Sequence, residues 1–223
     1  MDRDPIELFR RWQHEAHRSG VPAGSTDRQR MSRVRGAVWK VVAWAAGGEL
    51  PEANAATLAT ATHDGRPSAR TVLVKSASEQ GFVFFTSYLS RKASELEANP
   101  RAALLFYWPW PPRQVRVEGA VERISAEESD AYWRSRPRGS QLAAAASQQS
   151  AALDARATLL ARVEQLEREC RGCDVPRPPT WGGYRVLPEV MEFWESRPDR
   201  LHERVRYERI ASGEAWRTAI LQP

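Results

Sequence analysis

Apolar side chains recur at helical spacing near the start of the chain and alternate with polar ones over much of the remainder. Within residues 5–18, Ile6, Leu8, Phe9 and Trp12 fall on one side of a helix, which must therefore dock on a core. Runs with a period of two predict strands at 57–62, 68–75, 81–86, 102–107, 114–124, 181–186, 190–194 and 200–209. Five of these strands precede any long helix and have short connections, which favours an antiparallel barrel in a mostly β, α+β protein.

The connections between the strands carry turn and helix signals. His63-Asp64-Gly65 predicts that the first two strands form a hairpin. On the second of them, Arg70 and Lys75 point to opposite faces unless a β-bulge intervenes. The serine caps and apolar spacing predict helices at 90–99, 125–136 and 153–166, with Pro137 ending the second.

The first 53 residues differ in pattern from the rest of the chain. They contain the first helix, a loop rich in Pro, Gly and Ser, a basic run between Arg28 and Arg35, and the apolar segment 38–44. We expect an N-terminal helix and arm at 1–53 and a core domain at 54–223. A solvated face packed on the domain explains the basic run, and contact with nucleic acid or a membrane is the alternative.

The helix predicted at 90–99 departs from the usual charge pattern. Ser90 is a good N-cap, but Arg91 and Lys92 occupy the first turn, where the helix macrodipole disfavours cations. Positive side chains at a positive helix end are explained if an anion, most often phosphate, binds there. The alternative interpretation is two exposed cations with a small energetic cost.

Two further groups of donors can bind an anion or an electron-rich ring. Tyr132, Arg136 and Ser140 are spaced by four residues, so on a continuous helix they would share a face, with Lys75 as a candidate fourth donor. Near the end of the chain, Pro198-Asp199 signals a turn. Beyond the turn, a period of two would place three basic side chains on one strand face: Arg200, His202 and Arg204. A solvated edge strand is the alternative.

Composition narrows the class of protein. The chain has 223 residues, 42% of them hydrophobic, with nine tryptophans and a net charge of +5, which favours a globular protein and suits an acidic or phosphorylated ligand. There is no signal-peptide pattern and no apolar run near the length of about 20 residues that spans a bilayer, so we expect a cytoplasmic protein that contacts no membrane. The charge would suit a nucleic acid as readily as a small ligand, but only the run between Arg28 and Arg35 points to one, so we expect no nucleic-acid partner. Cys170 and Cys173 lack the companions of a zinc site, so we predict two free thiols and no metal.

Six ordered motifs carry a resemblance to a known family. They are RTVLVK, SRKASELEANPRAALLF, RQVRVEG, SRPRGSQLAAAASQQS, WGGYRV and EFWESRPDRLHER. Together they resemble the pyridoxamine 5'-phosphate oxidase family over residues 54–223. Motifs of this length and order are far more specific than a single glycine-rich loop.

The resemblance implies a split β-barrel that dimerises and holds FMN at the subunit interface. Carried over by position, it assigns the following residues to FMN: Arg70, Thr71, Val72, Leu73, Val74, Lys75, Phe85, Thr86, Arg91, Lys92, Gln114, Gln149, Ser150, Trp194 and Arg204. It assigns the substrate phosphate to Lys75, Tyr132, Arg136 and Ser140. Arg200 and His202, the expected catalytic pair, would hold the pyridine ring of the substrate against the flavin.

The implied reaction is oxidation of pyridoxamine or pyridoxine 5'-phosphate to pyridoxal 5'-phosphate, with O2 reduced to H2O2. The cofactor carries the electron chemistry, and the protein aligns the substrate and holds its phosphate. Two departures from the family stand out. The chain begins almost at its first helix, so we expect the usual N-terminal lid to be missing or replaced, and residues 25–48 look inserted and are a candidate replacement.

Three other functions stay open. The end of the chain, 219–223, and the phrase RLHERVRYER also resemble phenazine-biosynthesis flavin oxidases, which act on reduced tricyclic acids. An FMN oxidase of a specialised pathway is therefore one alternative. A carrier of pyridoxal phosphate or flavin that has lost turnover is the second, and nucleic-acid binding through the Arg28 to Arg35 run is the third.

Overall fold

The computed structural model describes residues 4–18, 52–210 and 215–223 of the chain. Eight strands form one antiparallel sheet in the order β3-β2-β1-β4-β5-β6-β7-β8, and an additional pairing of β3 with β6 closes six of them into a barrel. The strands are β1 (Ala55–Ala61), β2 (Pro67–Ser78), β3 (Gly81–Ser87), β4 (Arg101–Pro109), β5 (Pro112–Arg123), β6 (Trp181–Glu195), β7 (Glu203–Arg209) and β8 (Trp216–Leu221). The predicted antiparallel barrel with flanking helices is confirmed.

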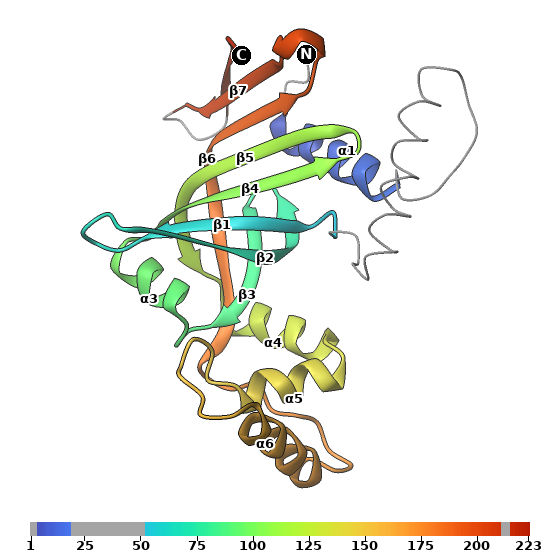
Figure 1. Cartoon of the computed structure of the whole chain (residues 1–223), viewed down its shortest axis with the longest axis vertical. Coiled ribbons are helices and arrows are strands. Elements are labelled where there is room, and N and C mark those ends of the chain that lie inside the picture. Colours follow the sequence, from blue (N-terminus) through green and yellow to red (C-terminus); the bar gives the residue numbers. More distant parts are fainter. Residues whose placement is uncertain (1–3, 19–51, 211–214) are drawn as a thin grey trace.

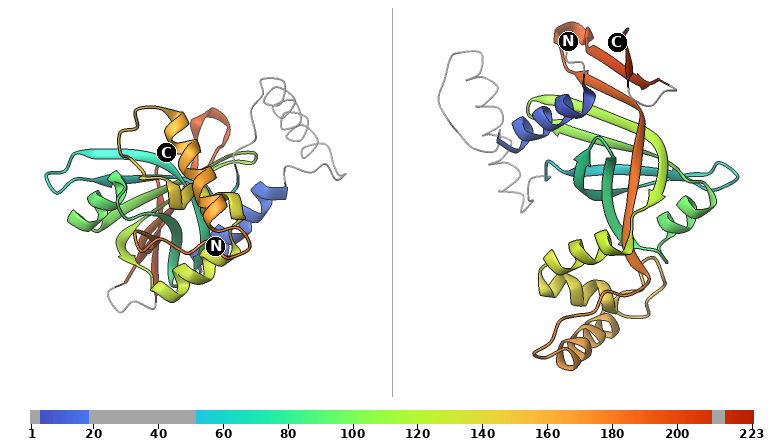
Figure 2. Two further views of the ribbon diagram at one scale, coloured as in Figure 1. Left: turned by 90° about the horizontal axis from the view of Figure 1, so that it is seen from below. Right: turned by 180° about the vertical axis from the view of Figure 1, so that it is seen from behind.

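Five helices flank the barrel in the described part of the chain. They are α1 (Pro5–Arg18), α3 (Arg91–Ala98), α4 (Ala126–Ser135), α5 (Arg138–Ala146) and α6 (Arg156–Glu169). Helices α4, α5 and α6 gather at one end of the long axis of the molecule, and β7 and β8 lie at the opposite end (Figures 1 and 2). None of the described helices is long and apolar enough to cross a membrane.

The barrel is filled by alternate side chains of its strands, and α1 closes onto this core. Phe9 lies with its ring centroid 5.0 Å from that of Phe82 and 4.8 Å from that of Phe106. Ile6 is fully buried and Trp12 is 8% exposed. The predicted docking of the first helix is confirmed, and its apolar stripe makes it an integral part of the barrel core.

Strand β6 connects the two ends of the molecule. Its first residues, Trp181–Val186, pair with β3, and its last residues, Val190–Glu195, pair with β7. At about 3.3 Å per residue, the 15 residues of β6 span roughly 50 Å. The sequence predicted two strands, 181–186 and 190–194, where the structure has one that changes partner. The register shift opposite, between Glu118 and Gly119 of β5, accommodates this change.

The structure refines several local predictions and adds elements that the sequence did not predict. A register shift between Val74 and Ser76 provides the β-bulge that the sequence left open at Lys75. Pro137 ends the second predicted helix, and a separate helix, α5, follows it at once. The helix predicted at 153–166 lies at 156–169, and β8 was not predicted. The basic run, segment 38–44 and the insertion at 25–48 lie outside the described residues.

Candidate functional site

The first turn of α3 gathers donors from distant parts of the chain, a group that we call the α3 site. Its members are Thr86, Arg91, Lys92, Gln149 and Ser150. Lys92 Nζ donates to Thr86 Oγ1 and to Gln149 Oε1, each at 3.2 Å, and the backbone N–H of Arg91 donates to Ser150 Oγ at 3.1 Å. Residues predicted to bind the same cofactor are therefore neighbours, although about 60 positions separate them in sequence.

Lys92 is a buried cation whose bonded partners are neutral. Its side chain is 8% exposed, and no acidic residue lies in the first turn of α3. Burial lowers the pKa of Lys92 and the neighbouring Arg70 lowers it further, while Glu95 partly opposes them. A desolvated ammonium at the positive end of a helix is stabilised by an anion, so the α3 site suits a phosphate.

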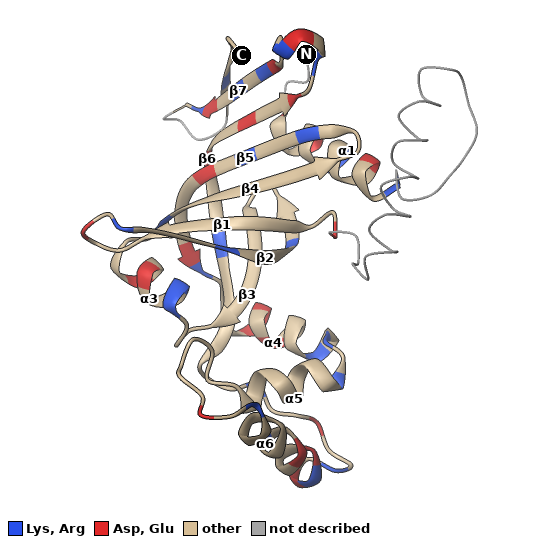
Figure 3. Ribbon diagram, in the orientation of Figure 1, with Lys and Arg blue, Asp and Glu red and all other residues tan. Residues whose placement is uncertain are grey.

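A buried carboxylate lies behind the α3 site. Glu95, one turn further along α3, accepts from Arg91 Nε at 2.8 Å and from Arg70 Nη2 at 3.1 Å. Burial alone would raise the pKa of Glu95, but hydrogen bonds from Ser68, Thr60, Arg91 and Arg70 outweigh it and lower that pKa to about 2. Figure 3 shows that α3 has one basic and one acidic segment.

The remaining β2 candidates differ in what they present to a ligand. Thr71 and Leu73 face outward, Val72 packs against the core, and Val74 is 3% exposed inside it. The guanidinium of Arg70 is directed at Glu95 and at the oxygens of Thr60, Ser68 and Leu58.

Beside the α3 site lies a set of stacked aromatic rings that carries a guanidinium, the Arg136 site. The rings of Phe85 and Tyr132 stack with centroids 3.8 Å apart, and Arg136 Cζ lies 4.8 Å from the ring centroid of Trp181. Arg136 Nη2 donates to the carbonyl of Ser140 at 3.0 Å. Phe85 and Thr86 are consecutive in β3, so both sites adjoin the same strand, although these two side chains point to its opposite faces.

The Arg136 side chain is poorly satisfied within the described chain. Its Nε is buried without a hydrogen-bond partner there, and burial lowers the pKa of the guanidinium. Burial also raises the pKa of Tyr132, with Arg136 opposing and Glu52 adding to that effect. Half-buried donors left without an acceptor are typical of a site that binds an anion.

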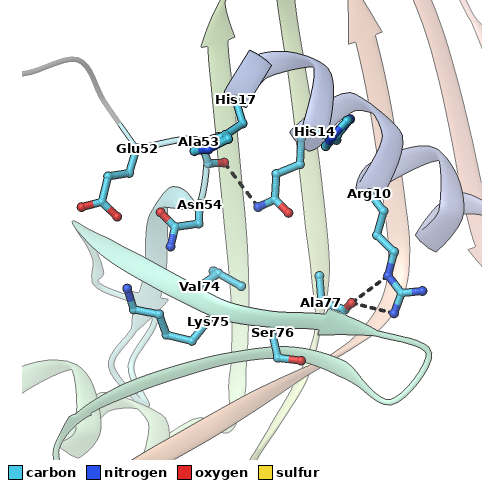
Figure 4. Close-up of a pocket in the computed structure, with 11 residues that line it drawn as sticks. Arg10, His14, His17, Glu52, Ala53, Asn54, Val74, Lys75, Ser76 and Ala77 are labelled. Carbon is cyan, nitrogen blue, oxygen red and sulfur yellow. Dashed lines mark hydrogen bonds between the residues drawn. The ribbon is translucent and has the colours of Figure 1, made fainter. Parts of the chain in front are cut away.

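Lys75 lines a pocket between α1 and β2, which we call the α1–β2 pocket (Figure 4). Its volume is about 560 Å³. In Figure 4 the ammonium of Lys75 lies on the side of Glu52 and Asn54. The lining of the pocket does not include Tyr132, Arg136 or Ser140. The other lining residues are Arg10, Gln13, His14, His17, Ala53, Val74, Ser76 and Ala77.

Sequence reasoning did not find this pocket. Its helical wall follows the spacing of a single helix face, at Arg10, Gln13, His14 and His17. That polar stripe was a usable signal, but only the folded structure shows that β2 lies opposite it. Arg10 is held against this strand by two bonds to the carbonyl of Ala77, at 3.0 and 2.9 Å.

The third group, the β7 site, lies at the far end of β6. Gln114, Trp194 and Arg204 are direct partners across three adjacent strands. The ring centroid of His202 lies 4.6 Å from that of Trp194, and His202 Nδ1 accepts from the backbone N–H of Arg197 at 3.3 Å. Four of the predicted residues, Gln114, Trp194, His202 and Arg204, are thus together.

The strand predicted at 200–209 begins later than expected. Arg200 belongs to the 3-10 turn Pro198–Arg200, His202 precedes β7, and of the three basic residues Arg204 alone lies in the strand. Asp199 and Arg200 have φ of 56° and 62°, a left-handed conformation that costs L-residues energy. The prediction that Arg200, His202 and Arg204 share one strand face was wrong, because this turn extends further than its Pro-Asp signal.

The chain does not bring all the predicted residues into one site. Trp181, of the Arg136 site, and Trp194, of the β7 site, lie at opposite ends of β6. Thirteen residues of extended strand separate them, or about 43 Å at 3.3 Å per residue. Figure 1 shows the α4 and α5 helices at one end of β6 and β7 at the other. In one copy of the chain, the predicted residues therefore fall into two separate groups.

Cys170 and Cys173 are free thiols. The described residues contain no group of His, Cys, Asp and Glu that would hold a metal ion.

Comparisons with known proteins identify related sequences. A family model described as pyridoxamine 5'-phosphate oxidase matches residues 45–170, and one described as pyridoxine 5'-phosphate oxidase C-terminal dimerisation region matches residues 181–223. A pyridoxine/pyridoxamine 5'-phosphate oxidase of Rubrobacter xylanophilus is 52% identical over 222 residues, which cover 100% of this chain and 88% of the relative. One of Burkholderia multivorans is 58% identical over 176 residues, 78% of this chain and 82% of the relative.

Solved structures show the same architecture. PhzG from Burkholderia lata 383, in complex with tetrahydrophenazine-1-carboxylic acid, has a TM-score of 0.73 and 34% identity, covering 92% of this chain and 96% of that one. A pyridoxamine 5'-phosphate oxidase-related, FMN-binding protein from Nostoc punctiforme has a TM-score of 0.63 and 22% identity, covering 85% and 97%. At that identity the second likeness shows the fold alone.

Proposed function

Because the chain belongs to the pyridoxamine 5'-phosphate oxidase family, we propose that it oxidises pyridoxamine or pyridoxine 5'-phosphate to pyridoxal 5'-phosphate. FMN is the proposed cofactor and O2 the proposed acceptor, with H2O2 as the second product. The observation that carries the proposal is the Arg136 site. The Arg136 Nε is buried without a hydrogen-bond partner among the described residues, close to Tyr132 and Ser140, and so suits the phosphate of the substrate.

The α3 site fits the phosphate of FMN. Lys92 is buried among neutral oxygens, and the guanidinium of Arg91 is 65% exposed at the same helix end. The described hydrogen-bond partners of Lys92 are neutral, and a monoester phosphate would supply the negative charge that they lack. Gln149 and Ser150 close one side of this position and would hold the phosphate against the helix.

Bound FMN would supply the two-electron acceptor for the oxidation, and dioxygen would restore it. The residues of the chain bind and orient. Arg136, Tyr132, Ser140 and Lys75 would fix the substrate phosphate, and this remote binding energy would align the reacting carbon. Hydrogen-bonding of His202 Nδ1 to the N–H of Arg197 leaves Nε2 as the nitrogen available to the substrate.

The two separate groups of residues suggest how the enzyme assembles. We propose a homodimer in which the β7 site of one subunit faces the α3 and Arg136 sites of its partner. A two-fold axis would pair opposite ends of the two long β6 strands and generate two equal sites. The match of residues 181–223 to a dimerisation region supports this arrangement, because that region contains all of β6 and β7.

A second candidate function is oxidation of a reduced tricyclic acid. The likeness to PhzG, at 34% identity, favours it. The presence of Lys75, Tyr132, Arg136 and Ser140 together favours the phosphorylated pyridine, because a carboxylate needs fewer donors than a phosphate.

The test is anaerobic addition of pyridoxamine 5'-phosphate to the purified protein. Loss of the flavin absorbance near 450 nm, followed by its recovery in air with formation of H2O2, is the expected result. A flavin reduced instead by a dihydrophenazine carboxylic acid would favour the second function. A flavin that neither substrate reduces would overturn both and favour a carrier.

A further inference from the structure

We infer that Glu95 is a positioning residue that makes the α3 site selective for a phosphate monoester dianion. This inference deepens the proposed function and rests on it, since the monoester in question is that of FMN. Glu95 touches neither the ligand position nor the reacting atoms. It acts through Arg91 and Arg70, the two guanidiniums that it holds.

The geometry gives Glu95 a role for each of its oxygens. Oε1 accepts from Arg91 Nε at 2.8 Å. This bond directs the guanidinium along α3 toward Glu95, and it does not involve the two Nη groups. Oε2 accepts from the hydroxyls of Thr60 and Ser68, each at 2.5 Å, and from Arg70 Nη2 at 3.1 Å. The carboxylate therefore links the ligand-facing helix turn to strands β1 and β2.

Arg70 is held in a second layer by the same network. Its Nη1 donates to the hydroxyl of Thr60 at 2.5 Å and to the carbonyl of Leu58 at 3.3 Å, while Nη2 also reaches Ser68 at 2.5 Å. With both Nη groups engaged by the protein, Arg70 contributes charge to the site, and Arg91 and Lys92 are the cations placed to contact a ligand.

The charge of the site follows from this arrangement. The pKa of about 2 keeps Glu95 ionised at neutral pH. The three cations Arg70, Arg91 and Lys92 less this one carboxylate leave a formal charge of +2. A phosphate monoester carries about −1.5 to −2 at neutral pH, so it matches the site. A flavin without phosphate gains nothing from it.

The competing explanation is that Glu95 only fastens α3 to the barrel. A purely structural ion pair would affect the stability of the protein and the binding of any flavin alike. The ratio of the dissociation constants of riboflavin and FMN separates the two explanations, because the two flavins differ only in the phosphate.

The chain offers a matched control for this test. Glu97 lies on the same helix, two residues beyond Glu95, and its carboxylate accepts from Arg123 Nε and from the Tyr184 hydroxyl, each at 2.8 Å. Glu97→Gln removes the same charge from α3 and also breaks an ion pair, but it leaves Arg70 and Arg91 untouched.

The experiment titrates the full chain, freed of flavin, with FMN and with riboflavin, and follows the quenching of flavin fluorescence. We expect Glu95→Gln to lower the riboflavin-to-FMN ratio of dissociation constants about tenfold, the value of one charge-assisted hydrogen bond. The lost placement of Arg91 then outweighs the rise of the formal charge from +2 to +3, which by itself would favour FMN. Glu97→Gln should leave the ratio within about twofold of wild type. An unchanged or higher ratio in Glu95→Gln would overturn the inference.

A second variant keeps the inference testable if Glu95→Gln does not fold. Glu95→Asp retains the charge but is one methylene too short to reach both guanidiniums, so the ratio of dissociation constants should also fall. An unchanged ratio would contradict the positioning role of Glu95. Failure of the proposed function looks different. In that case the wild-type protein itself would show no preference for FMN, or pyridoxamine 5'-phosphate would leave the bound flavin oxidised.

Discussion

Replacing Arg136 with methionine separates what this side chain contributes to binding from what it contributes to folding. The guanidinium is half-buried over the ring of Trp181, with Cζ 4.8 Å from the ring centroid. It donates one bond, to the carbonyl of Ser140, and its Nε is buried without a partner in the described chain. Methionine has a similar length and keeps the apolar contact with the indole while removing charge and donors.

The substitution should weaken substrate binding strongly but change the free energy of unfolding little. A charge-assisted hydrogen bond to phosphate contributes about 1.5–3 kcal/mol, so its loss should raise the apparent KM for pyridoxamine 5'-phosphate roughly 10- to 150-fold. For folding, the loss of the Ser140 bond and of a cation–π contact, each about 1 kcal/mol, is offset by relief from burying an unpaired cation. We expect the free energy of unfolding to change by less than about 1 kcal/mol.

The assay compares KM for pyridoxamine 5'-phosphate with KM for unphosphorylated pyridoxamine, and measures stability by urea denaturation. Arg134→Met is the control, since Arg134 is exposed in the last turn of the same helix. Equal losses with both substrates would refute the assignment of Arg136 to the phosphate. So would a loss of stability of about 3 kcal/mol or more, which would mark the residue as structural.

Three further predictions follow from groups elsewhere in the fold. Because the pKa of Glu95 is about 2 when folded and 4.5 ordinarily, its ionised form stabilises the native state above pH 4.5, by roughly 2 kcal/mol after allowance for solvent screening. This stabilisation is lost as the pH falls from 4.5 toward 2, so the difference in urea midpoint between wild type and Glu95→Gln should shrink on acidification, and a constant difference would contradict the assignment. Gly119→Ala places a Cβ 1.8 Å from the carbonyl oxygen of Leu187 and should cost about 2–4 kcal/mol in thermal unfolding. Gly139→Ala, with open space around its Cβ, is the control and should be neutral or stabilising. Since burial lowers the pKa of Lys92, FMN binding should raise it again and take up protons at alkaline pH. Calorimetry in two buffers of different ionisation enthalpy measures this uptake, and the absence of any uptake would count against Lys92 as a phosphate ligand.

The sequence predicted the α3 site because a local rule was broken. Cations at Arg91 and Lys92 oppose the helix macrodipole in the first turn, and the structure shows Lys92 buried there with neutral hydrogen-bond partners. Gln149 and Ser150 could be placed beside them only through the family resemblance. No periodicity relates residues about 60 positions apart, because their contact depends on the path of α4 and α5.

The features that the sequence missed depend on turn conformation and on tertiary contacts. The alternation at 200–204 imitates a strand, but the positive φ of Asp199 and Arg200 extends the turn. Asp tolerates this conformation better than most residues, whereas Arg200 gives no sequence signal for it. Glu95 was visible as the i+4 partner of Arg91. Its bond to Arg70, by contrast, depends on α3 lying against β1 and β2.

A mixed dimer tests whether each active site is built from opposite ends of two subunits. Arg136→Met disables the substrate grip and Arg204→Met disables the β7 site, so each homodimer should be impaired at both of its sites. Co-expression with two different affinity tags isolates the dimer that carries one chain of each kind.

In that mixed dimer, the native Arg136 of one chain and the native Arg204 of the other meet at a single site. We therefore expect about half of the wild-type kcat/KM per dimer, and about half of its flavin, from one intact site in two. If each chain instead built its own complete site, every site in the mixed dimer would carry one defect. Activity no higher than the mean of the two variant homodimers would show that the subunits do not share their active sites.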